Sequence, residues 1–127
     1  MKEYRKTFDD YQNNNVYIMK TGPDTIKVGI SNDPSRRRNE LQTGNPYEIE
    51  IVESFRSEFS SVIEARFQKK HKQHNVSGEH FHMSPDYAKK KLNEILHNVY
   101  EHVYYWSNDE GEVSIFSDRS YFDFENE

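Results

Sequence analysis

The chain has 127 residues, of which 33% are hydrophobic and 31% charged, and a formal net charge of -5 at pH 7. This length suits one domain with a genuine core, and the low apolar content means that the core must use many of the nine tyrosines and eight phenylalanines. The absence of cysteine excludes disulfides, thiolate metal sites and a cysteine nucleophile. No stretch has the length of a signal-peptide core or a membrane span, so we expect a cytoplasmic protein without a membrane partner.

The charge is unevenly distributed along the chain. Residues 1–15 are neutral overall, and residues 16–91 carry thirteen basic against ten acidic side chains. After Lys91, nine acidic residues face a single arginine. This asymmetry predicts a polar N-terminal extension (1–15), a basic working domain with a C-terminal helix (16–104) and an acidic aromatic tail (105–127).

Two apolar alternating runs, residues 16–20 and 26–31, predict a β-hairpin around the turn "TGPDT". Alternate side chains of a strand point to opposite faces. The even positions form the apolar face, which we expect to be buried: Val16, Ile18, Ile26, Val28 and Ile30. Tyr17 and Lys27 then share the other face, where Gly29 leaves the backbone open to close approach. We expect that face to be a shallow polar floor, although an ordinary solvated face would show the same pattern.

The remaining elements follow in chain order. Asp33 and Pro34 predict a helix start, and that helix runs to about Thr43. A strand is expected over 48–55, a helix from 61 to about 74, a short run at "EHFHM", and a helix from 84 with a clear apolar stripe. The tail predicts a hairpin around "SNDEGE". The fold class is therefore α+β, with a small three-stranded antiparallel or mixed sheet flanked by helices and followed by the acidic aromatic tail.

Five segments, "VYI", "KVGIS", "DPSRRRNELQTG", "IEARFQKKH" and "GEHF", stand in an order that resembles the GIY-YIG nuclease superfamily, in the branch common among phage and orphan bacterial domains. The resemblance covers roughly residues 16–83 and implies a GIY-YIG-like fold. It matches Tyr17 to the first-motif tyrosine and Lys27 to the second-motif position that usually carries tyrosine. It also matches Arg37 to the family's arginine, which stands eight residues after the motif glycine on the next helix. Glu64 matches the family's metal-binding glutamate on the later helix.

Two positions depart from the family pattern. Leu41 stands one turn after the arginine, where relatives often carry histidine or tyrosine, which leaves Tyr17 as the only obvious general base. A downstream asparagine found in some relatives has no evident counterpart. These departures keep an alternative open, namely a catalytically inactive DNA-binding or regulatory module that retains the fold.

The residue types suit phosphodiester hydrolysis. Tyr17 is a poor base unless its phenolate is favoured, and the ammonium of Lys27 would favour it. Arg37 offers a permanently charged fork for phosphate oxygens, and a lone carboxylate such as Glu64 suits Mg²⁺ or Mn²⁺. The leading prediction is a divalent-metal-dependent DNA endonuclease with a one-metal mechanism, as the resemblance implies.

Each motif also has a simpler explanation. Glu64 follows Ser61 by three residues, which is a capping-box spacing. Three consecutive arginines are often a solvated or phosphate-binding face. Four histidines, His71, His74, His80 and His82, have a spacing loosely compatible with zinc, although a basic helix approaching phosphates accounts for the first two as well.

The expected partner is double-stranded DNA. A domain this small has little extra surface for reading bases, which favours weak sequence specificity or a homodimer. The acidic tail would mask the basic surface or bind a protein partner. The predicted DNA contacts outside the catalytic set are Gly29, Ser31, Arg36, Arg38, Lys69, Lys70, His71 and Lys72.

Overall fold

The structure, a computed structural model, describes residues 2–7, 14–101, 103–107 and 112–117, and describes side chains over 14–101. The chain divides into two compact units, Asn13–Leu96 and a second one made of Met1–Gln12 with His97–Glu127. The domain boundaries drawn from the sequence at residues 15 and 104 stay a prediction.

The first unit contains a five-stranded antiparallel sheet in the order β4-β2-β3-β6-β5. Its strands are β2 (Asn14–Gly22), β3 (Thr25–Ser31), β4 (Glu50–Ser57), β5 (Asn75–Ser77) and β6 (His80–His82). The prediction of three strands is therefore wrong. The two additional strands have three residues each, which is too short for alternation to be visible in the sequence.

The predicted hairpin is present, with Asp24 in the left-handed conformation (φ 50°) at its turn. Its register places Tyr17 opposite Gly29 and Met19 opposite Lys27, so these side chains share one face as expected. The expectation of an open polar floor is wrong, because Tyr17 is 1% exposed and Lys27 is 5% exposed.

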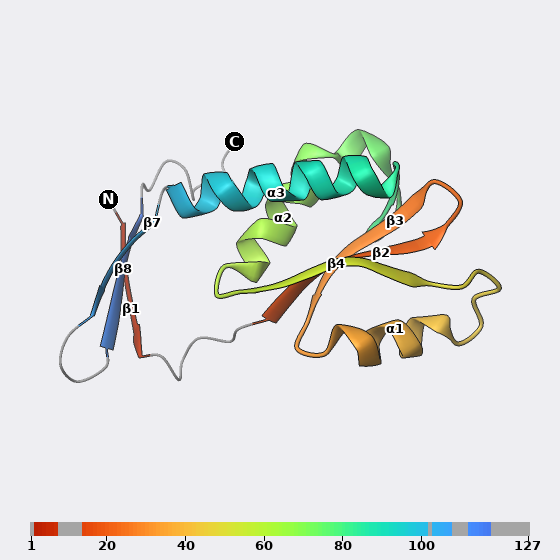
Figure 1. Ribbon diagram of the computed structural model, residues 1–127. Coiled ribbons are helices and arrows are strands. Elements are labelled where there is room, and N and C mark those ends of the chain that lie inside the picture. The colour runs from red at the N-terminus through yellow and green to blue at the C-terminus, as the bar shows by residue number, and fades with distance from the viewer. Residues whose placement is uncertain (1, 8–13, 102, 108–111, 118–127) are drawn as a thin grey trace. The chain divides into compact units, whose positions relative to one another are not determined.

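Both faces of the hairpin are covered, and the covering elements explain the burial. On the face of Tyr17 and Met19, a cluster forms with Ile49, against which Leu41 and Ile51 pack. On the opposite face, Val16, Ile18, Ile26 and Val28 are all fully buried. Figure 1 shows α1 (Pro34–Gln42) on one side of the sheet and α3 (Pro85–Glu101) on the other.

Helix α1 begins where the sequence predicts it. Asp33 is the N-cap residue and its carboxylate accepts a hydrogen bond from the backbone N–H of Arg36, while Pro34 occupies the first turn. None of the residues of α1 is fully buried, and Leu41 provides its apolar contact with the sheet. The cap at its start and the contact of Leu41 in its last turn are therefore two of the interactions that hold the helix.

Helix α2 (Ser60–Lys70) is shorter than predicted, and the turn η2 (Lys72–His74) follows it. Its N-cap is Phe59 without a side-chain capping bond, so the expected capping box of Ser61 and Glu64 is not formed. Phe67 packs edge-on against Phe81, with ring centroids 5.3 Å apart. Since Phe81 is paired with Ile26, this contact attaches α2 to the apolar face of the hairpin.

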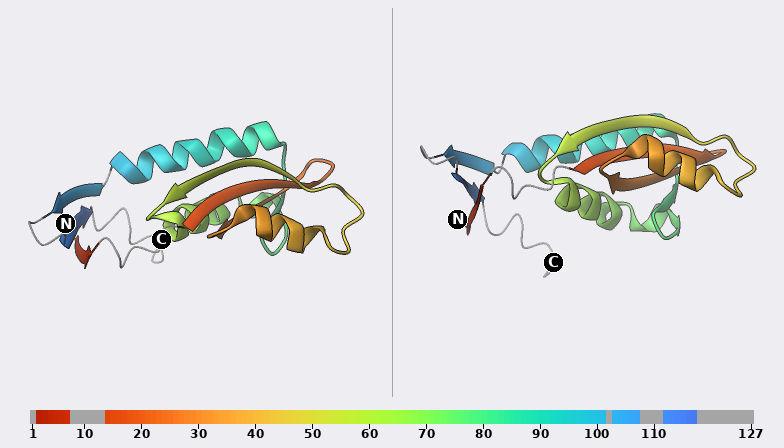
Figure 2. Two further views of the ribbon diagram at one scale, coloured as in Figure 1. Left: turned by 60° about the horizontal axis from the view of Figure 1, so that its bottom comes forward. Right: turned by 90° about the horizontal axis from the view of Figure 1, so that it is seen from below.

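Helix α3 carries the apolar stripe that the sequence predicts. Four of its residues are buried at helical spacing, namely Ala88, Leu92, Ile95 and Val99. Figure 2 shows α3 running along the sheet in both further views. Among the described residues, no helix is both long enough and apolar enough to cross a membrane.

The second unit contains a three-stranded antiparallel sheet in the order β1-β8-β7. It comprises β1 (Lys2–Thr7), β7 (Val103–Ser107) and β8 (Glu112–Ser117), so the predicted hairpin in the tail is confirmed. Residues 118–127 of the acidic tail lie outside the described residues, and they include Tyr121, Phe122 and Phe124.

Candidate functional site

Tyr17 lies on β2, an interior strand of the sheet, with its ring over Gly29 on β3. A Cβ atom built on Gly29 would lie 2.5 Å from the Tyr17 hydroxyl oxygen and 2.7 Å from the ring carbon that bears it. Glycine is therefore required at this position because the tyrosine covers the backbone directly. The close approach predicted at Gly29 is made by Tyr17 itself, and the expected contact of Gly29 with DNA stays a prediction.

Arg37 reaches Tyr17 from the first turns of α1. Its guanidinium lies close enough to the Tyr17 hydroxyl to act on it as a hydrogen-bond donor, and this interaction raises the pKa of Arg37. Burial is the largest influence on Tyr17 and raises its pKa above 10.0, while the bond from Arg37 acts in the opposite direction. The group that favours the Tyr17 phenolate is thus Arg37, whereas the sequence analysis assigned that effect to Lys27.

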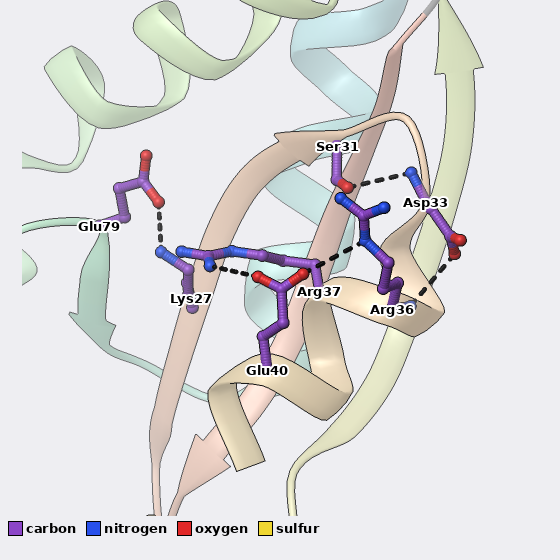
Figure 3. A network of polar contacts seen from close by, with 7 residues as sticks. All are labelled: Lys27, Ser31, Asp33, Arg36, Arg37, Glu40 and Glu79. Carbon is purple, nitrogen blue, oxygen red and sulfur yellow. Dashed lines mark hydrogen bonds and ion pairs between the residues drawn. The ribbon is translucent and has the colours of Figure 1, made fainter. Parts of the chain in front are cut away.

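Arg37 has a second partner on its own helix. Its Nη1 lies 3.3 Å from the Glu40 carboxylate, which also accepts from Arg36 Nε at 3.3 Å. Figure 3 shows Glu40 between the two arginines, with the Arg37 guanidinium directed toward Lys27. Exposed pairs of this kind contribute little to stability, so a phosphate could displace Glu40 at low cost.

Lys27 is buried on β3, and its ammonium forms an ion pair and hydrogen bond with the Glu79 carboxylate. Glu79 precedes β6, and its backbone carbonyl accepts a hydrogen bond from the Val28 N–H at 3.2 Å. Figure 3 shows the two side chains meeting on the side of β3 toward which Arg37 also points. The Lys27 ammonium is thus directed to Glu79 in this structure.

Glu64 projects from α2 into the same group of charges. Its pKa is raised to about 7 by burial first and by the negative charge of Glu79 second, and Lys27 opposes the rise. Glu64 in turn raises the pKa of Tyr17. The structure therefore brings together Tyr17, Lys27, Arg37 and Glu64 from four separate elements.

The donor set fits the metal that the resemblance implies. Glu64 Oε2 is buried and has no hydrogen-bond partner, so a hard oxygen ligand is available inside the site. A divalent cation beside it would replace the missing partner and offset the burial of the charge. No set of three or more histidine, aspartate or glutamate side chains suited to a metal occurs among the described residues. The fit is therefore to a cation with few protein ligands.

The additional DNA contacts predicted from the sequence divide into structural and exposed residues. Arg38 Nε donates to the Ile49 carbonyl at 2.9 Å, which fastens α1 to the loop before β4, and the Ser31 hydroxyl accepts from the Asp33 N–H. His71 is buried and its Nδ1 lies 3.0 Å from the Phe67 carbonyl oxygen, so its imidazole already has a partner within the fold, and its expected contact with DNA stays a prediction. Arg36, Lys69, Lys70 and Lys72 are exposed.

The histidines do not form the zinc site considered above within the part of the chain that the structure describes. His71 packs against Phe67 and Tyr87 instead. His80 is the cross-strand partner of Lys27, and burial, followed by the charge of Lys27, lowers its pKa. Both rings therefore favour the neutral form.

Glu79 is the residue of this site that the sequence analysis missed. It belongs to the segment "GEHF", in which the sequence pattern assigns no role to the glutamate. A single acidic residue in a turn shows no periodicity, so the acidic position itself was the only available signal. Its charge acts on Tyr17, Glu64 and Lys27, which places it at the centre of the group.

A family model for the T5orf172 domain matches residues 14–97. The chain belongs to the T5orf172 domain family. This phage-associated, endonuclease-like domain coincides closely with the compact unit Asn13–Leu96, and it contains all five residues of the site. No curated protein and no solved structure matches the chain.

Proposed function

We propose that this T5orf172 domain is a divalent-metal-dependent endonuclease that hydrolyses DNA phosphodiester bonds by a one-metal mechanism of the GIY-YIG type. The observation that carries the proposal is that the Arg37 guanidinium and the Glu64 carboxylate both lie close enough to the Tyr17 hydroxyl to influence its pKa. A base, a phosphate ligand and a metal ligand thus come from separate elements to one place.

Each side chain has a defined part in the proposed reaction. Tyr17 accepts the proton of the attacking water, and Arg37 partly offsets the burial that disfavours the Tyr17 phenolate. Arg37 leaves Glu40 and binds the scissile phosphate, for which its planar fork is suited. Lys27 adds positive charge on the same face of the sheet, where negative charge develops during the reaction.

Glu64 would hold Mg²⁺ or Mn²⁺ through its buried, unpartnered oxygen. When bound, the cation supplies Lewis-acid stabilisation of the phosphate and leaving oxygens. Glu64 would enter this role as the carboxylate. Its pKa of about 7 leaves part of it protonated at neutral pH, and an adjacent cation would favour the charged form.

A plasmid assay with paired arginine variants tests the proposal. Supercoiled plasmid is incubated with wild type, Glu64→Gln, Arg37→Ala and Arg36→Ala, with and without Mg²⁺. Arg36 and Arg37 are neighbours that share Glu40, but Arg37 is the one that binds Tyr17. We expect metal-dependent nicking that falls by about 10²–10³-fold in Arg37→Ala and only a few-fold in Arg36→Ala.

The control for copurified nuclease is Glu64→Gln prepared in parallel. Nicking that survives in both Glu64→Gln and Arg37→Ala would contradict the assignment. Equal losses in the two arginine variants would show that the charge of α1 matters, rather than the contact of Arg37 with Tyr17.

A second candidate is a DNA-binding or regulatory module that does not cleave. The observation in its favour is that burial raises the pKa of Tyr17 and that Leu41 provides no second base. This candidate predicts salt-sensitive retention of duplex DNA without a cut strand in Mg²⁺ or Mn²⁺. Duplex preference, a homodimer, a cytoplasmic location and masking by the acidic tail stay predictions from the sequence.

A further inference from the structure

Glu79 and Lys27 differ in how tightly the fold holds them. The Lys27 side chain is 7% exposed, whereas that of Glu79 is 39% exposed. The backbone around Glu79 is fixed, because its carbonyl is bonded to Val28 and His80 is paired with Lys27. The carboxylate of Glu79 can therefore change partner by side-chain rotation, while the Lys27 side chain remains buried on β3.

The Glu79 carboxylate also lies near a second acidic group. Its charge acts on Glu64, whose Oε2 is buried without a partner, and on the Tyr17 hydroxyl. Two carboxylates in one partly buried group repel each other unless positive charge lies between them. Lys27 supplies such charge to Glu79 through a direct contact, while it reaches Glu64 only through its field.

We propose that Glu79 is a second carboxylate of the divalent-cation site, and that it exchanges Lys27 for the cation when the site is loaded. This inference rests on the proposed function, because it concerns the cation that Glu64 would hold. Glu79 then has two alternative partners, the Lys27 ammonium in the metal-free protein and the cation in the loaded protein.

The exchange accounts for a feature that the catalytic assignment leaves unexplained. Lys27 shares a face with Tyr17, yet its ammonium is bound to Glu79, and the hydrogen bond to Tyr17 comes from Arg37. Once Glu79 turns toward the cation, the ammonium is released toward the Tyr17 hydroxyl and the phosphate. Metal loading would thereby complete the charged group on the face of β2 and β3.

A simpler reading is that the ion pair of Lys27 with Glu79 only fastens the turn before β6 to β3. Both readings predict that removing the Lys27 charge strengthens cation binding, since any nearby ammonium repels a cation. They differ in whether that gain needs Glu79. Competition for Glu79 makes the gain depend on it, whereas plain repulsion leaves the gain intact or enlarges it.

A double-mutant cycle separates the two readings. Mn²⁺ binding to the purified full chain is measured by electron paramagnetic resonance, without DNA, for wild type, Lys27→Met, Glu79→Gln and Lys27→Met/Glu79→Gln. We expect Glu79→Gln to weaken binding by about 10- to 100-fold. Lys27→Met should strengthen binding by about tenfold in the wild-type background, and most of this gain should be lost when Glu79 is glutamine.

Controls keep the outcomes distinct. Glu48→Gln removes one exposed charge elsewhere in the unit and should leave binding unchanged, and thermal unfolding reports whether each variant is folded. The double variant has no unpaired buried charge, so it guards against a fold defect in Glu79→Gln alone. Unchanged binding in Glu79→Gln, or a gain from Lys27→Met that is undiminished in that background, overturns the inference while the nuclease proposal stands. Wild-type protein that neither binds Mn²⁺ nor nicks plasmid overturns both.

Discussion

The two faces of the β2–β3 hairpin are equally buried but are built from different chemistry. One face presents Val16, Ile18, Ile26 and Val28, which are fully buried aliphatic side chains. The other presents Tyr17 and Lys27, and its polar atoms are bonded to Arg37 and Glu79 from other elements. Burial therefore does not distinguish the aliphatic face from the face that carries the proposed site, whereas the identity of the bonding partners does.

This comparison indicates how a small domain accommodates a charged site next to its core. Polar groups removed from water are stable only when they are hydrogen-bonded or paired. On the Tyr17 face, α1 and the "GEHF" turn provide those partners, and both come from outside the hairpin. The two faces should consequently respond to mutation in opposite ways, one through activity and the other through stability.

Gly29→Ala should give the largest effect, because it should lower both the nicking activity and the stability of the protein. The new Cβ would fall 2.5 Å from the Tyr17 hydroxyl and would push the ring away from Arg37. We expect a loss of nicking activity of about 100-fold and a stability loss of about 1–3 kcal/mol. Nicking rates and urea unfolding measure the two effects.

Gly22→Ala is the matched control for this variant. Its nearest neighbours would be the Thr25 side-chain atoms, at 3.7 Å and 3.8 Å, which is ordinary contact. Activity and stability should both stay close to those of wild type. If Gly29→Ala behaved in the same way, the close packing of Tyr17 on β3 would not hold the catalytic hydroxyl in place.

Ile18→Ala tests the opposite face at a position directly beside Tyr17 in the chain. Ile18 is fully buried, so truncation should cost about 2–5 kcal/mol of unfolding free energy through lost burial and a cavity. The nicking rate per folded molecule should stay within a few-fold of wild type. A large loss of activity in the folded fraction would show that the two faces are not separable.

Much of this arrangement was predictable from local patterns. Alternation correctly assigned Tyr17, Lys27 and Gly29 to one face, and Asp33 with Pro34 correctly located the start of α1. Both features depend on interactions within a few residues along the chain. Local chemistry dominates there, and the sequence displays it directly.

The remainder depended on contacts between distant segments. The burial of Tyr17 comes from Leu41 and Ile49, and the partner of Lys27 is Glu79, fifty-two residues away. Strands β5 and β6 are too short to show a period. Periodicity states which way a side chain points, but it does not state what will cover it.

Arg38→Met should have a smaller effect than the core substitution and should test how α1 is held over the Tyr17 face. It removes the hydrogen bond from Nε to the Ile49 carbonyl while it keeps the aliphatic stem. We expect a stability loss of about 1–2 kcal/mol in urea unfolding. Arg36→Met, on the exposed side of the same helix, should change stability by less than about 0.5 kcal/mol. Equal effects would show that the loop contact does not anchor α1.

The smallest expected effect is that of His71→Gln on the pH dependence of stability. It extends the comparison to buried ionisable groups. Lys27 is buried as half of an ion pair, whereas His71 is buried against the Phe67 ring, with Lys70, His74 and Lys91 as its charged neighbours. Burial lowers the pKa of His71 below 6.5, and these three neighbours lower it further, while the Phe67 carbonyl opposes the shift. The neutral ring is therefore the form that the fold accepts.

The sign of the pH dependence follows from proton counts. Between the unfolded pKa of 6.5 and the lower folded pKa, the unfolded chain binds more protons than the folded one. The His71 contribution to stability is therefore complete above pH 6.5 and is lost as the pH falls through the folded pKa. In His71→Gln, which keeps a donor for the Phe67 carbonyl, urea unfolding between pH 8 and 5 should show a shallower decline than wild type. His97→Gln, at an exposed position of α3, should retain the wild-type slope, and the same slope in His71→Gln would mean that another group causes the loss.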